Sequence, residues 1–582
     1  MIGARGGRMV LSGLPRTVVL ILGLVVGLLV IPDATGFAGA PSVATTYYVH
    51  SSATCPGSGT AAAPWCDFRA VNKMVLKPGD QVLLKSGDTF TTPLLIHGSG
   101  TSSRYVQVGS YGSGRMPVLD GNSARGFVGI NIYQSSYVEI DDLAIENAAA
   151  GILINDSTSQ TGFRFLDLYL SGDVDGIQSP AGIPAGTASH VLVQDVEAAN
   201  NRLGCKFNGC AGFALALGSV SDVIVNRLFS FNNCGATSWS LGAGASNVLI
   251  ENSKSIGDAG CAELGGETAN FIDNDTNITF VNDVVADAQF NSTGVDFSGI
   301  DLEPSDGPDS SINIEDNYIA HNAGPGIQLL DHPAAISNVK ISGNLLVDNG
   351  GHWSPVAYPV LGQVWTDEWL PGFAQSTGSI TDNLYDAPAE TGGFEQLHAQ
   401  ANYDGIIQSD NIDLGASGNE WYAADGFSCT TQGANQWSYQ SSTDGSDWTN
   451  LSGCTAVESL DQEWSTGGPA NGFVSNFEEM PPSTSGSWVA RSWKAPAAAL
   501  TSVRGRILMS SPTCRSGVTA EITKSGTTKP IWGPQVIHAG NETGVATNLN
   551  GIGVTAGDVV HFAVQGDGSR QCRVSWTPSV AS

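Results

Sequence analysis

The stretch Asn277-Ile-Thr-Phe-Val-Asn-Asp-Val decides the fold of this 582-residue chain, because it is one copy of a unit that recurs. In each copy polar and apolar residues alternate over the length of a strand, and Asn or Asp stands near the turn. The copies start at Tyr137, His190, Asp222, Asn247, Asn277, Ser311 and Asn338. Successive starts lie 53, 32, 25, 30, 34 and 27 residues apart, and the first gap fits two units. A repeat of this length indicates a solenoid.

The repeated units are strands without helices between them, which excludes a βαβ fold. They predict a coil of strands whose inward residues stack from turn to turn. Asn suits the corners of such a coil because it tolerates left-handed backbone. The repeats resemble those of the pectin-lyase-like superfamily over roughly residues 45–415. The resemblance implies a right-handed parallel β-helix, and it is far less specific for chemistry.

The segment before the repeats matches the same family. Tyr47-Tyr-Val-His-Ser-Ser is an extended start, and Lys77-Pro-Gly-Asp-Gln-Val-Leu-Leu leads into the first coil. Between them, Asp67-Phe-Arg-Ala-Val-Asn-Lys-Met-Val has the pattern of a short amphipathic helix. The open end of a solenoid has to be covered. We therefore expect this helix to cap the coil.

Residues 421–582 are rich in Ser, Thr, Gly and Trp and contain alternating strands separated by Gly-containing turns. This pattern favours an antiparallel β-sandwich. It is similar to the carbohydrate-binding-type sandwiches appended to secreted polysaccharide-active enzymes. Its tryptophans either stack on sugars or fill the sandwich core, and the sequence leaves both open. The fold class is thus all-β, a β-helix followed by a β-sandwich.

The first 40 residues have the features of a secretory signal peptide. Arg5, Arg8 and Arg16 precede an apolar run over residues 18–31, which is short for a membrane span, and small residues follow. An uncleaved membrane anchor is the alternative. We expect a secreted protein that has no membrane association after cleavage.

Composition narrows the range of partners. The formal net charge is −30, which argues against nucleic acid because phosphate binding needs Lys and Arg. A neutral polysaccharide or oligosaccharide fits better than a polyanion, unless calcium bridges the charges. We expect a monomer without a cofactor or bound metal, calcium being the one possible ion.

Ten cysteines in an exported chain predict disulfides. Proximity in sequence suggests five pairs: Cys55/Cys66, Cys205/Cys210, Cys234/Cys261, Cys429/Cys454 and Cys514/Cys572.

A column of carboxylates is the candidate site. Strands aligned after each turn place Gly299-Ile-Asp-Leu-Glu next to Cys261-Ala-Glu-Leu-Gly and Gly326-Ile-Gln-Leu-Leu. If Ile300 and Leu302 point inward, Asp301 and Glu303 point outward on one exposed face. The alignment puts Glu263 beside Asp301 from the preceding coil. It puts Gln328 beside Asp301 from the following coil.

Carboxylates this close raise one another's pKa, so that one holds a proton while another stays ionised. Glycoside hydrolysis needs that division, and hydrolases of the resembled superfamily place acids on consecutive coils of one face. The sequence predicts Asp301 and Glu303 as the catalytic pair, with Glu263 tuning their pKa or sharing the acid role. Calcium binding and a solvated turn are the alternatives.

Further residues would contact the substrate. Gln328 would bind substrate, and His332 would orient a carboxylate or bind a sugar hydroxyl. Trp353 and Trp365 lie in a segment without a strand pattern and would wall a cleft or pack the domain junction.

The leading function is a secreted glycoside hydrolase acting on a polysaccharide. A lyase on a uronic-acid polymer is one alternative, with Lys206, Arg227 or Lys254 as its base, although none of them lies in the carboxylate column. A non-catalytic surface or adhesion protein is the other. The spacing of i and i+2 on a strand, about 6.6 Å, does not decide between inversion and retention.

Overall fold

A computed structural model describes residues 43–582 apart from short stretches. These stretches are 124–125, 156–158, 180–187, 202–211, 240–243, 260–267, 290–296, 332–333, 351–361, 369–375, 387–394, 398–404, 414–419, 425–426, 458–460, 466–471, 477, 510–513, 515–516, 528, 539–544 and 567–571. Residues 44–582 form one compact unit.

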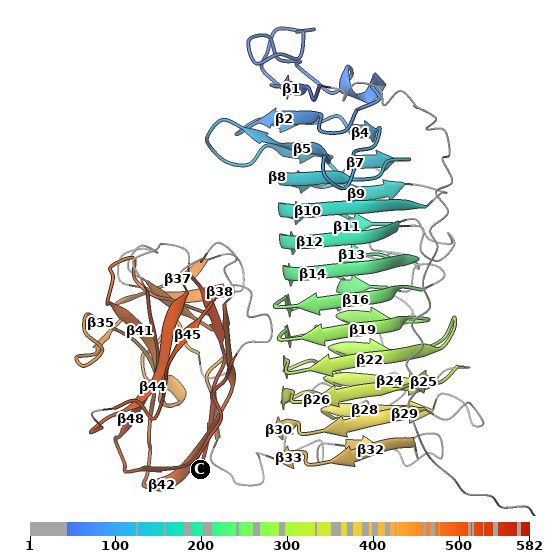
Figure 1. The fold of residues 1–582 in the computed structure, drawn as a ribbon. Helices are drawn as coiled ribbons and strands as arrows, with labels where there is room; N and C mark the ends of the chain where they lie inside the picture. Colours follow the sequence, from blue (N-terminus) through green and yellow to red (C-terminus); the bar gives the residue numbers. More distant parts are fainter. Residues whose placement is uncertain are drawn as a thin grey trace, which may run out of the picture. The chain divides into compact units, whose positions relative to one another are not determined.

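Parallel strands stack as successive rungs from β1 to β33 (Figure 1). Most of them form a 22-stranded sheet that bends around a corner and so provides two faces. Its strands are β1 (Thr46–Val49), β2 (Gln81–Lys85), β3 (Thr89–Phe90), β5 (Val106–Tyr111), β6 (Val118–Asp120), β8 (Val138–Glu146), β10 (Gln160–Ser171), β12 (Ala188–Ala199), β14 (Val220–Phe231), β16 (Ser246–Glu251), β17 (Lys254–Ile256), β19 (Thr276–Val281), β20 (Val284–Ala286), β22 (Asp309–Glu315), β23 (Tyr318–Ala320), β25 (Ile336–Ser337), β26 (Val339–Ser342), β27 (Leu345–Val347), β29 (Thr377–Thr381), β30 (Leu384–Asp386), β32 (Gly405–Ser409) and β33 (Ile412–Asp413).

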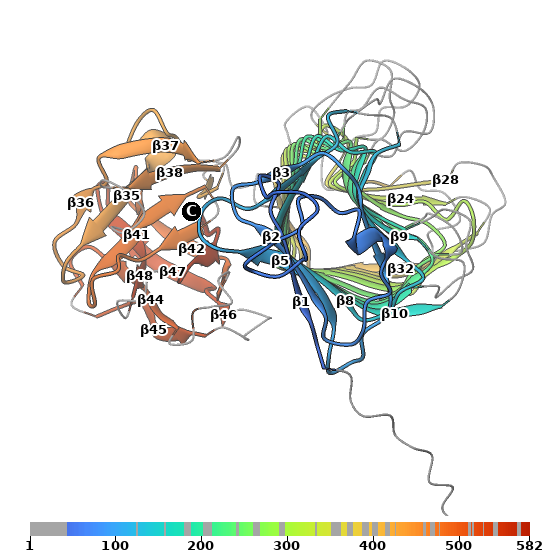
Figure 2. The same cartoon turned by 90° about the horizontal axis from the view of Figure 1, so that it is seen from above.

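An 11-stranded parallel sheet forms the third face, and Figure 2 shows the coil along its axis. We call it the third sheet. Its strands are β4 (Leu94–His97), β7 (Val128–Tyr133), β9 (Ala150–Asn155), β11 (Asp175–Gln178), β13 (Phe213–Ala216), β15 (Gly235–Ser238), β18 (Asn270–Ile272), β21 (Ile300–Leu302), β24 (Ile327–Asp331), β28 (Val364–Glu368) and β31 (Glu395–Leu397).

The residue that starts each repeat has left-handed backbone, as the sequence predicts for Asn. The φ angles of Asn247, Asn277 and Asn338 are 55°, 58° and 56°. In the wide first gap, Gly162 takes the same conformation with φ 78°, and its strand β10 pairs with both β8 and β12. The gap therefore holds two coils, as predicted. This copy escaped the repeat pattern because a glycine replaces the polar residue at its corner.

Alternation in the strands fills the core. Inward Val, Ile and Leu side chains such as Val225, Ile250 and Ile314 are 0–3% exposed and stack along the coil. Burial of such side chains is the main favourable contribution to folding, about 1.5–3 kcal/mol for each.

Buried amides link neighbouring coils at one corner. The backbone N–H groups of Asn317, Asn344 and Asn383 donate to the side-chain oxygens of Asn344, Asn383 and Asn411 at 3.0, 3.0 and 3.1 Å. The Nδ2 of Asn344 also donates to the carbonyl oxygen of Ile314. This ladder satisfies backbone groups that the turns would otherwise leave unpaired in the interior.

The N-terminal cap is shorter than predicted. Residues 67–75 form only a 3₁₀ turn, η1 (Val71–Lys73), and not an amphipathic helix. Phe68 and Val71 are nonetheless buried, and the ring of Phe68 packs 4.9 Å from that of Phe90. Met74 has extended backbone and ends the turn. Two apolar side chains thus reach the core without a full helical turn.

Antiparallel sheets follow the coil. A four-stranded sheet comprises β34 (Glu420–Tyr422), β42 (Ala499–Arg504), β47 (Leu549–Val554) and β50 (Ser579–Ala581). A six-stranded sheet comprises β35 (Trp437–Ser442), β36 (Thr449–Asn450), β41 (Trp488–Lys494), β44 (Val518–Lys524), β45 (Trp532–Ile537) and β48 (Val559–Gln565). A seven-stranded sheet comprises β37 (Gly453–Val457), β38 (Asp461–Ser465), β39 (Phe473–Ser475), β40 (Glu478–Met480), β43 (Arg506–Met509), β46 (Val545–Ala546) and β49 (Val574–Trp576). A 3₁₀ turn, η4 (Ala434–Gln436), precedes β35.

Tryptophans fill the core of this second domain. Trp437, Trp493 and Trp576 are 0% exposed, which settles for these three the choice between core packing and sugar stacking.

Three predicted disulfides are present: Cys55–Cys66, Cys429–Cys454 and Cys514–Cys572. The other two predicted pairs involve residues outside the described ones. Within residues 43–582 as described, no helix is long and apolar enough to cross a membrane.

A parallel β-helix followed by antiparallel β-sheets is therefore the architecture of the chain, as the sequence predicts.

Candidate active site

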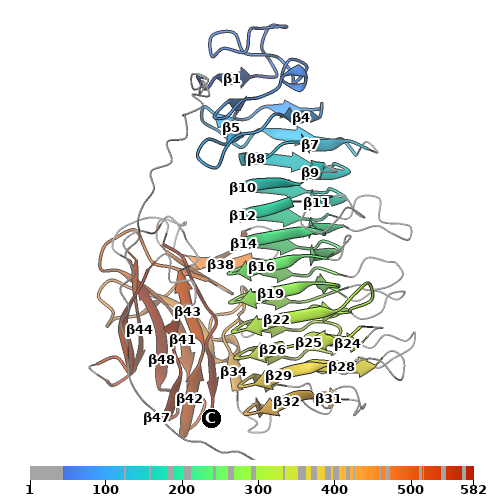
Figure 3. The ribbon, with the colours of Figure 1, turned by 45° about the vertical axis from the view of Figure 1, so that its right-hand side comes forward.

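Asp301 lies on β21 of the third sheet, whose strands are seen stacked in Figure 3, and Glu303 directly follows that strand. The register of β18, β21, β24 and β28 places Phe271, Asp301, Gln328 and Trp365 side by side on successive coils. Neighbouring strands are about 4.8 Å apart. The prediction that Gln328 neighbours Asp301 is confirmed.

Alternation along β21 is as predicted, but exposure is not. Ile300 and Leu302 are 0% exposed in the core, so Asp301 and Glu303 lie on the opposite face of the strand. Asp301 is also 0% exposed, whereas Glu303 is half-buried. The prediction of two exposed carboxylates is therefore wrong for Asp301. Alternation tells which face a side chain takes, and it does not tell whether that face is covered.

Trp365 also lies in a regular element and not in an irregular segment. It belongs to β28, next to Gln328 in the ladder, and is 3% exposed. Its position in the same column as Asp301 keeps it near the predicted site. The sequence pattern hid this strand because Val364-Trp-Thr-Asp-Glu lacks the apolar alternation of the other repeats.

The register corrects the partner expected from the preceding coil. In the register of the preceding coil, Phe271 pairs with Asp301, the position that the sequence alignment gave to Glu263. Glu263 itself lies outside the described residues. The alignment went wrong because it took Cys261-Ala-Glu-Leu-Gly as the strand, whereas the strand is β18, which begins at Asn270.

Asp273 is the carboxylate that the preceding coil contributes. Ile272 pairs with Leu302, and the backbone N–H of Glu303 donates to the carbonyl oxygen of Ile272 at 3.0 Å, so Asp273 and Glu303 follow side by side. Asp273 is 3% exposed. Sequence analysis missed Asp273, although it occupies in its own coil the position that Glu303 occupies in the next coil.

The loop after Glu303 folds back onto Asp273. The hydroxyl of Ser305 donates to Asp273 Oδ2 at 2.8 Å, and the backbone N–H of Asp306 donates to Oδ1 at 2.9 Å. Burial raises the pKa of Asp273, whereas these two hydrogen bonds lower it. The negative charges of Asp306 and Glu303 raise it further. The interaction of two carboxylates on adjacent coils, predicted for Glu263, thus occurs between Asp273 and Glu303.

Two further aspartates are buried behind this pair. The backbone N–H of Asp273 donates to Asp275 Oδ2 at 3.1 Å, and that of Asp275 donates to Asp309 Oδ1 at 2.9 Å. Both side chains are 0% exposed. Burial is the largest cause of the raised pKa of Asp309, which reaches about 8. Asp275 and Asp309 each stand two residues before the left-handed residue of their repeat, Asn277 and Ser311. This recurring position can be found in the sequence.

Substitution of Asp309 by Asn should therefore alter how stability depends on pH. Between an unfolded pKa of about 3.9 and the folded pKa of about 8, the folded chain holds a proton that the unfolded chain has lost. The stability contributed by this proton is complete at low pH and lost as pH rises toward 8. Asn keeps the acceptor for the N–H of Asp275 and does not titrate.

We expect the Asp309→Asn chain to gain stability relative to the parent between pH 5 and pH 8, by at most about 1.4 kcal/mol per pH unit. Denaturant midpoints at the two pH values measure it. A difference in stability between the variant and the parent that is the same at both pH values would contradict the assigned protonation of Asp309.

Other predicted residues lie outside the described part of the chain, namely His332 and Trp353 together with Glu263. Among the described residues, no group of three or more His, Cys, Asp or Glu side chains is arranged to hold a metal ion.

The basic residues considered for a lyase lie elsewhere. Arg227 is on β14 of the 22-stranded sheet and binds both carboxylate oxygens of Asp195 at 2.6 and 2.9 Å. Lys254, on β17 of the same sheet, lies 3.5 Å from Glu478. Lys206 lies outside the described residues.

Comparisons with known proteins give no match to a family model and none to a curated protein. Among solved structures, a GH136 lacto-N-biosidase from Eubacterium ramulus is 15% identical, with 63% of this chain and 68% of that chain covered and a TM-score of 0.39. The pectate lyase Pel9A is 16% identical, with 68% and 86% covered and a TM-score of 0.33. PfbA, a surface adhesin of Streptococcus pneumoniae, is 12% identical, with 54% and 79% covered and a TM-score of 0.34.

These structural matches include a hydrolase, a lyase and an adhesin. They therefore do not indicate which activity this chain has.

Proposed function

We propose that the chain is a secreted glycoside hydrolase that cleaves a polysaccharide with the carboxylates of Glu303 and Asp301. The observation that carries the proposal is the environment of Glu303. Its half-buried side chain stands at the end of β21, beside the buried Asp273 on the preceding coil and two residues from the buried Asp301.

This environment favours different protonation states in neighbouring carboxyl groups. Burial, the largest cause, raises the pKa of Asp273 beside Glu303, so protonation is favoured at Asp273 relative to an ordinary aspartate. Hydrolysis needs one carboxyl group to protonate the leaving oxygen and a carboxylate to act as base or nucleophile. We assign the contact with the leaving oxygen to Glu303, the more accessible group, and the second role to Asp301. Asp273 replaces Glu263 as the group that shares the proton.

Positions along the same column would bind the sugar chain. Gln328 offers an amide next to Asp301, and Trp365 lies one coil further. His332 and Trp353 remain proposed substrate contacts. The proposed reaction uses no metal and needs one copy of the chain.

One observation favours a glycoside hydrolase over a lyase, and another favours a secreted protein over an intracellular one. Arg227 and Lys254 are engaged in ion pairs on the other sheet, so neither is available as a base at the third sheet. Three disulfides suit an oxidising compartment, and the proposed signal peptide would deliver the chain to it.

A panel of neutral and uronic-acid polysaccharides tests the proposal. We expect new reducing ends from at least one neutral polymer, no ultraviolet absorbance from a new double bond, and unchanged activity in the presence of EDTA. Double-bond absorbance on a uronic-acid polymer would establish a lyase. Binding to a polymer without cleavage would favour the adhesion function.

A further inference from the structure

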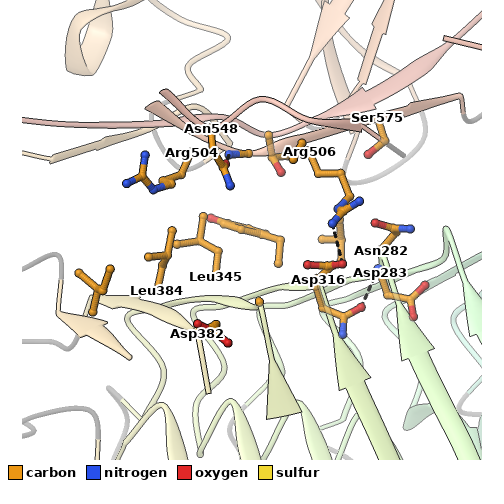
Figure 4. A pocket seen from close by; sticks show the side chains of 18 of the residues that line it. Asn282, Asp283, Asp316, Leu345, Asp382, Leu384, Arg504, Arg506, Asn548 and Ser575 are labelled. Atoms are coloured by element: carbon orange, nitrogen blue, oxygen red, sulfur yellow. Dashed lines mark hydrogen bonds and ion pairs between the residues drawn. The ribbon is translucent and has the colours of Figure 1, made fainter. Parts of the chain in front are cut away.

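A cleft of about 350 Å³ lies between the outer face of the 22-stranded sheet and the antiparallel domain (Figure 4). Both belong to the compact unit of residues 44–582. Its lining from the coil includes Asp316, Asp382 and Leu384, and its lining from the antiparallel domain includes Arg504 and Asn548. The volume is that of a small-ligand site, and such sites occur preferentially between domains.

One wall of the cleft is an apolar stripe. The register of β20, β23, β27, β30 and β33 places Val284, Tyr318, Leu345, Leu384 and Ile412 side by side on successive coils. Ile412, at the end of the stripe, is 50% exposed. Val284 and Tyr318 are only 5% and 6% exposed, so the accessible part of the stripe is Leu345, Leu384 and Ile412, onto which the C–H face of a sugar ring can pack.

A row of carboxylates runs beside the stripe. Asp316 is held by Arg506 at 2.8 Å across the cleft. Asp382 and Asp410 are exposed, and no described residue bonds to their side chains. Gly343 separates them from Asp316 in the row, and a Cβ at Gly343 would collide with Asp316 Oδ1. All four residues have left-handed backbone, with φ between 57° and 70°.

A buried acid also lines the cleft. Asp283 is 3% exposed, and its Oδ1 accepts the backbone N–H of Ser253 at 2.7 Å. Its Oδ2 is buried without a hydrogen-bond partner among the described residues. Burial, the largest cause, raises the pKa of Asp283 well above its usual value and so favours the protonated carboxyl group.

We propose that this cleft is a second carbohydrate-binding site that takes an uncharged mono- or disaccharide. The apolar stripe matches a sugar's C–H face, and the adjacent carboxylates accept hydrogen bonds from its hydroxyls. Arg504 and Arg506 oppose Asp316, Asp382 and Asp410, so the opposing charges nearly balance and favour an uncharged ligand over an anion. The choice of a sugar rests on the proposed function, but the site uses none of the third-sheet carboxylates.

Isothermal titration of the full chain with cellobiose, xylobiose, lactose and maltose tests the site. The informative variant is Asp382→Gly/Asp410→Gly, because glycine keeps the left-handed backbone, as Gly343 does on the same row. We expect saturable binding of at least one disaccharide by the parent and a loss of affinity of about tenfold or more in the variant. Glu303→Gln should bind it as the parent does, which separates this site from the catalytic one.

The matched control is Asp222→Gly, the same change at an exposed left-handed position away from the cleft (φ 55°). It should bind like the parent. The proposal is overturned if no disaccharide binds, if the double variant binds as tightly as the control, or if binding disappears in Glu303→Gln. It is also overturned if calcium chloride alone gives the saturable heat that the double variant loses.

Discussion

Glu303→Gln should abolish hydrolysis of any polysaccharide that the parent cleaves, with a loss in kcat of about 10³-fold, and leave the melting temperature unchanged. General acid–base catalysis by one side chain contributes about 10²–10⁴-fold, and Gln cannot supply or take up the proton. The side chain is half-buried and stands at the end of a strand, so the isosteric change removes little packing. Initial rates and thermal unfolding of the purified variant measure both effects.

The control is Glu315→Gln, the same substitution at a half-buried position of β22 on the other sheet. It breaks only a surface ion pair with Lys340, which contributes little, and should keep full activity. Asp301→Asn should also lose activity, but its side chain is fully buried, so a change in melting temperature is expected as well. Full activity in Glu303→Gln would place the catalytic acid elsewhere.

Asn344→Ala should destabilise the coil by about 4 kcal/mol, because each buried polar group left unpaired costs about 1–3 kcal/mol. The change removes the acceptor of the Asn317 backbone N–H and Nδ2, and the donor to the carbonyl oxygen of Ile314. Asn344 is 0% exposed, so water cannot replace these bonds. Denaturant unfolding measures the loss.

Asn313→Ala, one coil earlier, is the matched control. Its side chain is half-buried on the outer face, with one hydrogen bond to Thr279 at 3.3 Å. The free energy of unfolding of Asn313→Ala should stay within about 0.5 kcal/mol of the parent's. Equal losses in the two variants would contradict a structural role for the buried ladder.

The repeat could be predicted from the sequence because its corners and strands follow local rules. Residues such as Asn277 and Asn338 take the left-handed backbone that Asn tolerates, and the apolar residues between them enter the core. A gap of twice the usual length could be read as two coils even though Gly162 carries no polar side chain.

Pairing between coils could not be predicted in the same way. The loop before β18 has no fixed length, so counting from Cys261 chose the wrong strand and gave Asp301 the wrong neighbour. Only the register of β18 with β21 shows that Phe271 adjoins Asp301 and that Asp273 adjoins Glu303.

Burial on the outer face was equally inaccessible to sequence patterns. Asp301 alternates with core residues and so was predicted to be exposed, yet it is 0% exposed. Asp275 and Asp309 are buried as well, and each stands two residues before the left-handed corner of its own repeat.

The measurement that tests the central claim most directly is product analysis after digestion in ¹⁸O-labelled water. Hydrolysis by the Glu303 and Asp301 carboxylates adds water across the glycosidic bond, so each new reducing end should carry one ¹⁸O when products are analysed before the anomeric oxygen exchanges with solvent. The fragment with the new non-reducing end should carry no ¹⁸O and no double bond. Unlabelled products with a double bond at the new non-reducing end would show elimination and contradict the account.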